Sequence, residues 1–329
     1  MKRNKSNYQG TLWVILTVLV HCSFAWGQVG ISSGAELDVS RNFASKPVPQ
    51  WENGFLFGFE MDPPSAPPVY AYDENGHKLF ETPLAVDSAI RIVPGAMAAS
   101  RDGLFAISGS AYSASGDGVV FIAVLDRTGR LVRVTRTGGF APIRLCYTSD
   151  GTLWASGRPV TYPSIDEPPD HDILRAYNAD GTLRMSLLPQ STFPKAPHKS
   201  HPVRISNLSS NGKLIAFLSV EYNELVGISS EGKVLFRNQF APPGRDYYVT
   251  GFAVSADSEI YMSCQVASPV DKKRLEVAFY RWDGAASKWQ KVYSGPLTGN
   301  GAHHAIFGFG PDGMLESTKL PHFKWVQVP

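Results

Sequence analysis

Five histidines fall in irregular, proline-rich or glycine-rich segments where side chains could converge on a metal. Imidazoles and carboxylates are ordinary ligands of divalent transition metals, and four acids accompany the first histidine: Asp166, Glu167, Asp170 and Asp172. The pattern therefore suggests a divalent metal ion as cofactor. No pair has a diagnostic ligand spacing, so solvated or structural loop histidines are the alternative. The five candidates are His171, His198, His201, His303 and His304.

Arginines form a second candidate group, because a guanidinium can hold an anionic small molecule through two parallel hydrogen bonds. Arg144 and Arg204 each precede a predicted turn by seven or eight residues, and Arg245 lies in a loop. The alternative is that they form salt bridges between repeats. Arg144 and Arg204 also differ by one residue in register, which predicts that they point to opposite faces of their sheets.

Tyr247 and Tyr248 follow the proline-rich residues 241–244 and resemble a recognition loop. Tyrosine offers a large contact area at a small cost in side-chain entropy. Tyr248 could instead simply begin a strand. Residues 62–68 and 161–169 are also rich in proline and predict stiff loops, although proline in an exposed connection also stabilises a fold without any partner.

Nucleophilic catalysis has no support from the sequence. The chain has no G-x-S-x-G motif, and Cys146 and Cys264 lie within strand-like apolar patterns of repeats that are not neighbours. We therefore expect two buried free thiols rather than a nucleophile or a disulfide.

The elements that must position these residues are set by an internal repeat. One series of turns carries a glycine at intervals of 53, 52, 51 and 52 residues. Apolar alternation precedes and follows each turn, which predicts a hairpin whose glycine adopts a positive φ. The glycines are Gly76, Gly129, Gly181, Gly232 and Gly284.

A second series of turns alternates strictly with the first. Its members read Glu-Asn-Gly at 52–54, Ser-Arg-Asp-Gly at 100–103, Ser-Asp-Gly at 149–151, Ser-Ser-Asn-Gly at 209–212, Ser-Ala-Asp-Ser at 255–258 and Gly-Pro-Asp-Gly at 310–313. The 259 residues from Gly54 to Gly313 span five intervals of about 52. The two series therefore share one period.

Two hairpins per repeat, without helical periodicity between them, predict four antiparallel strands per unit, which is a propeller blade. Six turns of the second series set six inner hairpins, whereas five turns of the first set five outer hairpins. We therefore expect an all-β, six-bladed β-propeller. Residues 323–328 would supply the third strand of the last blade, and residues 31–39 from the other chain end would close it.

The recurring S-x-D-G-x-L/I turn, followed by an apolar strand, resembles secreted six-bladed propellers of the NHL and TolB-like kind. The resemblance covers nearly all of residues 28–329. It implies the fold but no single activity, because those families include binding modules as well as lyases and lactonases. The YWTD signature, the sialidase-type Asp box and the tryptophan pattern of quinone-binding propellers are absent from the sequence.

The first residues read as an export signal. Lys2, Arg3 and Lys5 precede an apolar run over residues 11–20, and the A-x-G pattern at Ala25 and Gly27 predicts cleavage after residue 27. An uncleaved anchor is one alternative. A lipoprotein is another, based on Cys22, although lipid attachment prefers a small residue where His21 stands. We thus expect a signal peptide over 1–27 and a propeller domain over 28–329, periplasmic or secreted.

Composition narrows the function. The formal charge of +2 is too small for the usual footprint of a nucleic-acid binder, and no segment after residue 27 is long and apolar enough to span a membrane. The leading hypothesis is a monomeric binding or scaffolding module that holds a protein, peptide or glycan on a loop-rich face. The rival hypothesis is a metal-assisted lactonase, hydrolase or lyase at the mouth of the central channel. The sequence does not decide whether the protein is an enzyme.

Overall fold

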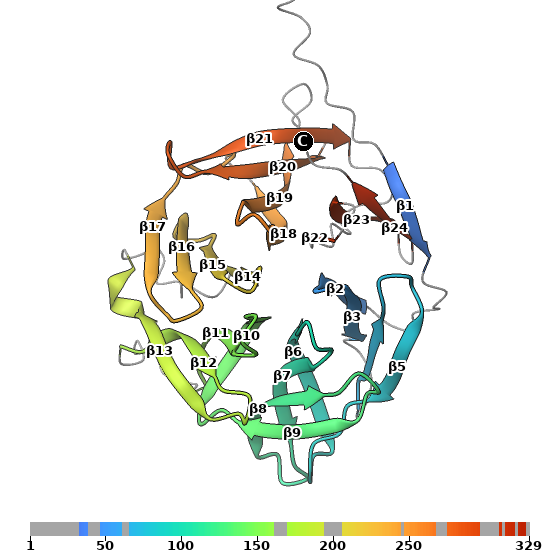
Figure 1. Ribbon diagram of the computed structural model, residues 1–329. Coiled ribbons are helices and arrows are strands. Elements are labelled where there is room, and N and C mark those ends of the chain that lie inside the picture. Colours follow the sequence, from blue (N-terminus) through green and yellow to red (C-terminus); the bar gives the residue numbers. More distant parts are fainter. Residues whose placement is uncertain are drawn as a thin grey trace, which may run out of the picture.

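The protein is an all-β propeller. The computed structural model describes residues 33–38, 47–60, 66–160, 170–193, 206–244, 247–267, 275–296, 309–310, 313–319 and 322–326. Within these residues the chain forms 24 strands and one short 3₁₀ helix, η1 (Gln190–Thr192). Antiparallel four-stranded sheets stand radially around a common axis (Figure 1).

Five blades follow one another along the chain, each running from its innermost to its outermost strand. Their strands are, in blade 1, β2 (Pro47–Glu52), β3 (Phe55–Glu60), β4 (Pro68–Tyr72) and β5 (Lys78–Pro83); in blade 2, β6 (Arg91–Ala99), β7 (Phe105–Tyr112), β8 (Gly118–Leu125) and β9 (Leu131–Arg136); in blade 3, β10 (Phe140–Tyr147), β11 (Leu153–Pro159), β12 (Asp172–Tyr177) and β13 (Leu183–Pro189); in blade 4, β14 (Ser206–Ser210), β15 (Leu214–Ser219), β16 (Glu224–Ser229) and β17 (Val234–Gln239); and in blade 5, β18 (Tyr248–Val254), β19 (Ile260–Ala267), β20 (Leu275–Asp283) and β21 (Lys288–Pro296).

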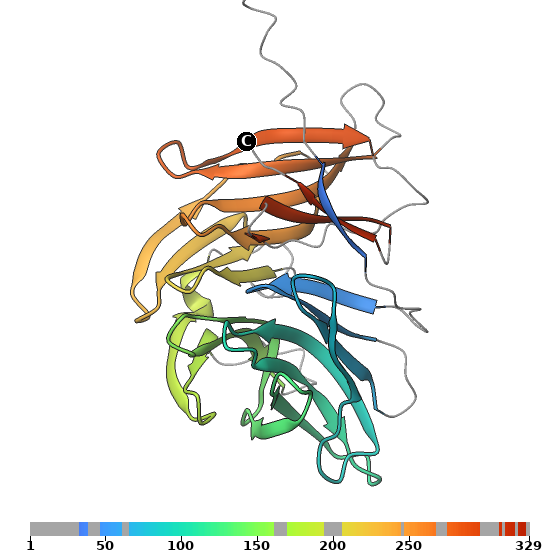
Figure 2. The same cartoon turned by 45° about the vertical axis from the view of Figure 1, so that its right-hand side comes forward.

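A further sheet combines strands from both ends of the sequence. It has the order β22 (Phe309–Gly310), β23 (Gly313–Lys319), β24 (His322–Val326) and β1 (Ser33–Asp38). β1 pairs antiparallel with β24, with Leu37 opposite Phe323. This sheet lies between blade 5 and blade 1 in Figures 1 and 2.

The antiparallel order places all turns of both predicted series on one side of the ring, which we call the turn face. The connections from second to third strands and those between blades lie on the other side, the loop face. The first four outer-turn glycines and the inner-turn glycines of blades 1 to 4 have φ between 78° and 95°, as predicted. Glycine adopts this left-handed backbone without steric cost.

Blade 5 departs from the predicted turn chemistry. Gly284 does not have a positive φ; Ser287 (φ 49°) takes the left-handed position instead. The reason is a longer turn: Asp283 ends β20, its carboxylate accepts a hydrogen bond from Ala286 N (3.0 Å), and β21 begins only at Lys288. At the inner turn of the same blade, Ser258 (φ 65°) stands where the other blades have glycine or asparagine followed by glycine.

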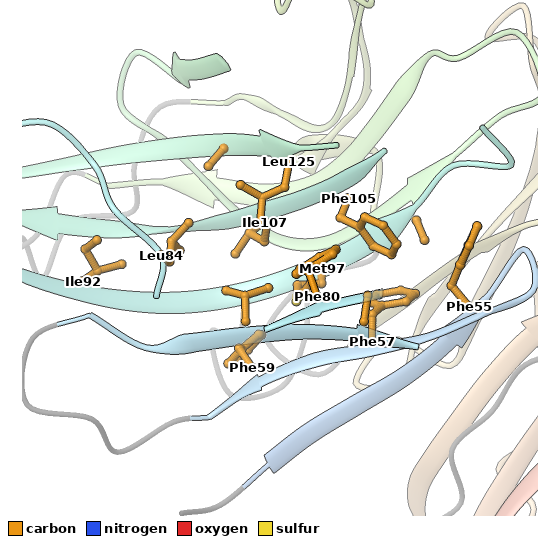
Figure 3. Packing of buried hydrophobic residues seen from close by; sticks show 14 of the residues in the cluster. Phe55, Phe57, Phe59, Phe80, Leu84, Ile92, Met97, Phe105, Ile107 and Leu125 are labelled. Atoms are coloured by element: carbon orange, nitrogen blue, oxygen red, sulfur yellow. The ribbon is translucent and has the colours of Figure 1, made fainter. Parts of the chain in front are cut away.

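The core lies between blades rather than at a single centre. Between blades 1 and 2, Phe105 meets the rings of Phe55, Phe57 and Phe80 edge-on, with centroids 5.3, 5.8 and 5.1 Å away (Figure 3). All four rings are buried. Aromatic pairs favour this arrangement over face-to-face stacking, so the interlocked rings fix the angle between neighbouring blades.

Both described thiols are structural, as predicted. Cys146 in β10 and Cys264 in β19 are buried and free, and burial raises the pKa of each thiol. A thiol held in its protonated form is a poor nucleophile. In the part of the chain that the structure describes, no helix is long and apolar enough to cross a membrane.

Candidate functional site

The predicted metal ligands fall mostly outside the described residues. His198, His201, His303 and His304 lie there, together with Asp166 and Glu167, so the structure does not test their convergence. His171 is described, and its carbonyl accepts a hydrogen bond from Gln190 N (2.9 Å). Over the described ranges, no three His, Cys, Asp or Glu side chains gather as a metal site.

Asp170, next to His171, has a structural partner. Its carboxylate accepts hydrogen bonds from the backbone N–H (2.9 Å) and the hydroxyl of Ser191 in η1. The hydroxyl contact is the main cause that lowers the pKa of Asp170. This aspartate therefore holds the short helix that follows β13.

The predicted tyrosine pair divides between two roles. The hydroxyl of Tyr247 donates to Asn223 Oδ1 (3.1 Å) in the β15–β16 connection of blade 4, and burial raises its pKa. Tyr248 is the first residue of β18 and is 64% exposed. Successive residues of an extended chain point in opposite directions, so Tyr247 ties blade 5 to blade 4 whereas Tyr248 faces solvent.

Arg144 lies on the innermost strand of blade 3 and is only partly exposed. Its Nη1 donates to the carbonyl of the preceding residue, Ile143 (2.9 Å). Burial lowers the pKa of this guanidinium, and the nearby Tyr248 of blade 5 acts in the opposite direction. The structure thus brings together two of the five predicted ligand-binding residues; the remaining two, Arg204 and Arg245, lie outside the described residues.

A β-bulge explains the position of Arg144. Three innermost strands bulge at the same level: between Pro94 and Ala96 in β6, between Pro142 and Arg144 in β10, and between Val249 and Gly251 in β18. The extra residues are therefore Gly95, Ile143 and Thr250. Each stands eight positions before the inner-turn residue with positive φ, namely Gly103, Gly151 and Ser258.

The bulge changes the register argument made from the sequence. An extra residue interrupts the strict alternation of side chains and re-aims those beside it. Ile143 packs against the apolar cluster that contains Cys146 and Phe217, on the side of blade 4, although three residues separate it from Cys146. Simple counting along β10 therefore does not give the direction of Arg144.

Solvent exposure changes at the bulge level. Beyond it, toward the turn face, every residue of these strands is buried: 96–99 in β6, 145–147 in β10 and 251–254 in β18. Before it, toward the loop face, each strand has exposed or half-buried residues, among them Gly95, Arg144 and Tyr248. We call Arg144, Tyr248 and Thr250, the described polar side chains at this level, the axial site.

The sequence held a signal for the bulges that its analysis missed. Proline precedes the bulge in two of the three strands, and a glycine stands opposite it, pairing Pro94 with Gly109 and Pro142 with Gly157. A Cβ atom on Gly109 would lie 2.5 Å from Val93 O, and one on Gly157 would lie 2.3 Å from Ala141 O. Only glycine fits where the bulged backbone approaches so closely.

The turn face contains a second group that the sequence analysis missed, the carboxyl of Glu52. This residue ends β2, and its oxygens accept hydrogen bonds from Ala99 N at the end of β6 (2.8 Å) and Tyr147 N at the end of β10 (3.5 Å). Burial raises its pKa from 4.5 to about 8, against the opposing effect of both hydrogen bonds. The available signal was a glutamate where the other inner turns begin with serine or glycine.

Further hydrogen bonds link the inner turns of the remaining blades. Ser149 of blade 3 donates from N (3.1 Å) and Oγ (3.0 Å) to Gly212 O of blade 4. Asn211 Nδ2 donates to Ser255 O of blade 5 (2.8 Å), and Arg101 Nη2 reaches from blade 2 to Asn211 O (3.2 Å). The turn face is thus bound together across blades 1 to 5.

No protein-family model matches this chain, and no curated protein matches it in sequence. A candidate exported protein from Bacteroides fragilis NCTC 9343 is similar in structure, with 10% identity, 87% of this chain and 83% of that chain covered, and a TM-score of 0.52. A gluconolactonase from Xanthomonas campestris has 15% identity, coverage of 89% and 88%, and a TM-score of 0.46. A protein of unknown function from Bacteroides caccae has 13% identity, coverage of 76% and 73%, and a TM-score of 0.43. At these identities the likeness concerns the fold alone: the chain is a β-propeller.

Proposed function

We propose that this protein is an exported binding module that holds a protein, peptide or glycan ligand on the loop face of a six-bladed propeller. In this proposal residues 1–27 are removed on export. β1 then completes the sixth blade by pairing with β24, so that strands from both ends of the sequence close the ring. Closure of this kind leaves no blade without its outer strand.

The observation that carries the proposal is the difference between the two ends of the innermost strands. Their turn-face halves are buried and linked across blades, whereas their loop-face halves expose side chains around the axial site. A rigid scaffold with variable loops on one face is the usual setting of a binding site. Support for the axial position comes from Tyr248, a large exposed aromatic on an otherwise well-packed strand.

The test is a binding screen of the purified protein on glycan and peptide arrays, with two variants beside the wild type. Tyr248→Ala removes an exposed ring at the axial site, and Lys233→Ala removes an exposed side chain at the outer turn of blade 4 as a matched control. We expect Tyr248→Ala to weaken binding of any retained ligand at least fivefold and Lys233→Ala to leave it unchanged. Equal binding by all three proteins, or no ligand on either array, contradicts the proposal.

Metal analysis of the same protein separates the binding module from the metal-assisted hydrolase, lactonase or lyase. That alternative rests on His171, His198, His201, His303 and His304. Stoichiometric bound metal that disappears in a His303→Ala/His304→Ala variant would favour the enzyme.

A further inference from the structure

We infer that the axial site binds a carboxylate group of its ligand and that the guanidinium of Arg144 is the group that holds it. This inference rests on the proposed function, because it specifies the chemistry of the ligand on the loop face. It extends the sequence hypothesis of an anionic ligand to one residue, one chemical group and one level of the ring.

The first step is the unpaired charge of Arg144. Half-buried arginines on outer parts of the blades have acidic partners: Arg237 pairs with Glu224, Arg184 with Asp150 (3.0 Å) and Arg281 with Glu259 (3.3 Å). Within the described ranges no acidic side chain pairs with Arg144, whose one hydrogen bond goes to Ile143 O. A charge withdrawn from water without a counterion is costly, and a bound anion removes that cost.

The second step is the geometry that the bulge creates. Arg144 directly follows the extra residue of β10, at the level where the innermost strands change from exposed to buried. Ile143 is anchored in the apolar cluster between blades 3 and 4, so the backbone beneath the guanidinium is fixed. A preorganised donor loses less entropy on binding than one on a mobile loop.

The third step is the number of donors. A guanidinium carries five N–H groups in a planar fork, and Arg144 uses one of them in its bond to Ile143 O. The remaining edge matches the two oxygens of a planar carboxylate. A single cation balances the single charge of a carboxylate, whereas a phosphate dianion would call for a second cation, and the described axial site has none.

Tyr248 completes the site from the opposite side of β14. It extends from blade 5, is close enough to influence the pKa of Arg144, and exposes 64% of its surface. An exposed aromatic ring beside a guanidinium suits a ligand that carries its carboxylate on an apolar or sugar-like body. We therefore expect an acidic sugar or an acidic peptide side chain rather than a free inorganic anion.

The experiment compares pairs of probes that differ only in charge. Glucuronate is compared with glucose, and N-acetylglutamate with N-acetylglutamine, by NMR titration of the arginine Nε–Hε resonances of the full-length mature protein. The Arg144 resonance is assigned by its absence in Arg144→Lys. We expect at least one carboxylate probe to shift this resonance and to saturate, and its uncharged partner to bind at least tenfold more weakly.

Variants test the residue itself. Arg144→Met should lose at least tenfold in affinity for the carboxylate probe, and Arg144→Lys, which keeps the charge but not the fork, should fall between Met and the wild type. Arg136→Met, on the exposed strand β9, is the matched control and should bind like the wild type. Thermal unfolding checks that each variant is folded, and Arg144→Lys serves if the Met variant is not.

Three results would overturn the inference: equal binding of charged and uncharged probes, equal binding by the wild type and the Arg144 variants, or tighter binding of inorganic phosphate than of either carboxylate. If a ligand from the arrays still binds in a Tyr248-dependent but Arg144-independent manner, the proposed function stands and this inference fails. If the arrays and the carboxylate probes are all negative, both fail.

Discussion

The two faces of the ring solve the same problem in opposite ways. On the turn face, polar groups of the innermost strands are bonded to other blades, as Glu52 is to Ala99 and Tyr147. On the loop face, the described polar side chains of the axial site make few bonds to the protein, and Tyr248 is largely exposed. The comparison indicates that one face holds the blades together while the other is left available for a ligand.

The largest expected effect concerns Glu52 and pH. Its pKa of about 8 in the folded protein exceeds the ordinary value of 4.5, because burial favours the protonated carboxyl. The stability that this group contributes is therefore complete below pH 4.5 and is lost as the pH rises through about 8. We expect a loss of roughly 3–5 kcal/mol in the free energy of unfolding over this range.

Urea unfolding of the wild type and Glu52→Gln at pH 5 and pH 9 measures this effect. The glutamine cannot ionise, so its free energy of unfolding should fall less between the two values. Glu74→Gln, an exposed carboxyl of the same blade, should behave like the wild type. Parallel pH dependences of the wild type and Glu52→Gln would refute the role of this carboxyl on the turn face.

The next effect tests the bulge that divides the two faces. Gly157→Ala places a methyl group 2.3 Å from Ala141 O and 2.6 Å from the ring of Phe140, so β10 must shift. We expect a loss of about 2–3 kcal/mol in the free energy of unfolding, measured by chemical denaturation. Gly244→Ala, whose methyl group would meet no atom within 4 Å, should cost less than 0.5 kcal/mol. Similar losses in both variants would show that the close approach at Gly157 does not matter.

A smaller effect tests the hydrogen bonds between turns. Asn211→Ala removes the donor to Ser255 O and to Ser258 Oγ (3.0 Å), together with the acceptor of Leu214 N (2.9 Å). We expect a loss of about 1–2 kcal/mol in thermal or urea unfolding, with unchanged ligand binding on the loop face. Asn178→Ala, which breaks a local bond to Thr182 Oγ1 at an exposed outer turn, should cost about 0.5 kcal/mol or less. A binding defect in Asn211→Ala would mean that the faces are coupled.

The smallest effect on stability belongs to Tyr248. Because this side chain is 64% exposed, Tyr248→Ala should change the free energy of unfolding by no more than about 0.5 kcal/mol. Tyr247→Phe, which breaks the bond to Asn223, should cost about 1 kcal/mol while leaving ligand binding intact. The reverse assignment, with Tyr247 needed for binding and Tyr248 for stability, would invert the division between the two tyrosines.

Much of the fold was predictable because it depends on short stretches of chain. A turn such as Asp126 to Gly129 needs a glycine with positive φ and an aspartate that accepts nearby backbone N–H groups, and both lie within five residues. The period of these turns indicated the four-stranded blades. Burial of Cys146 and Cys264 followed from the apolar strands around them.

The candidate site was only partly predictable, because its contacts join residues of different blades. Arg144 and Tyr248 were both identified as candidates, but the separate role of Tyr247 and the Gly284 turn were not foreseen. The sequence by itself determined where strands and turns occur, since hydrogen bonding and sterics within a few residues decide this. Only the tertiary structure decided that Glu52 is enclosed by β6 and β10, and that bulges set Arg144 at the boundary between the buried and the exposed halves of the ring. Burial and charge pairing depend on groups tens of residues away, which no local pattern specifies.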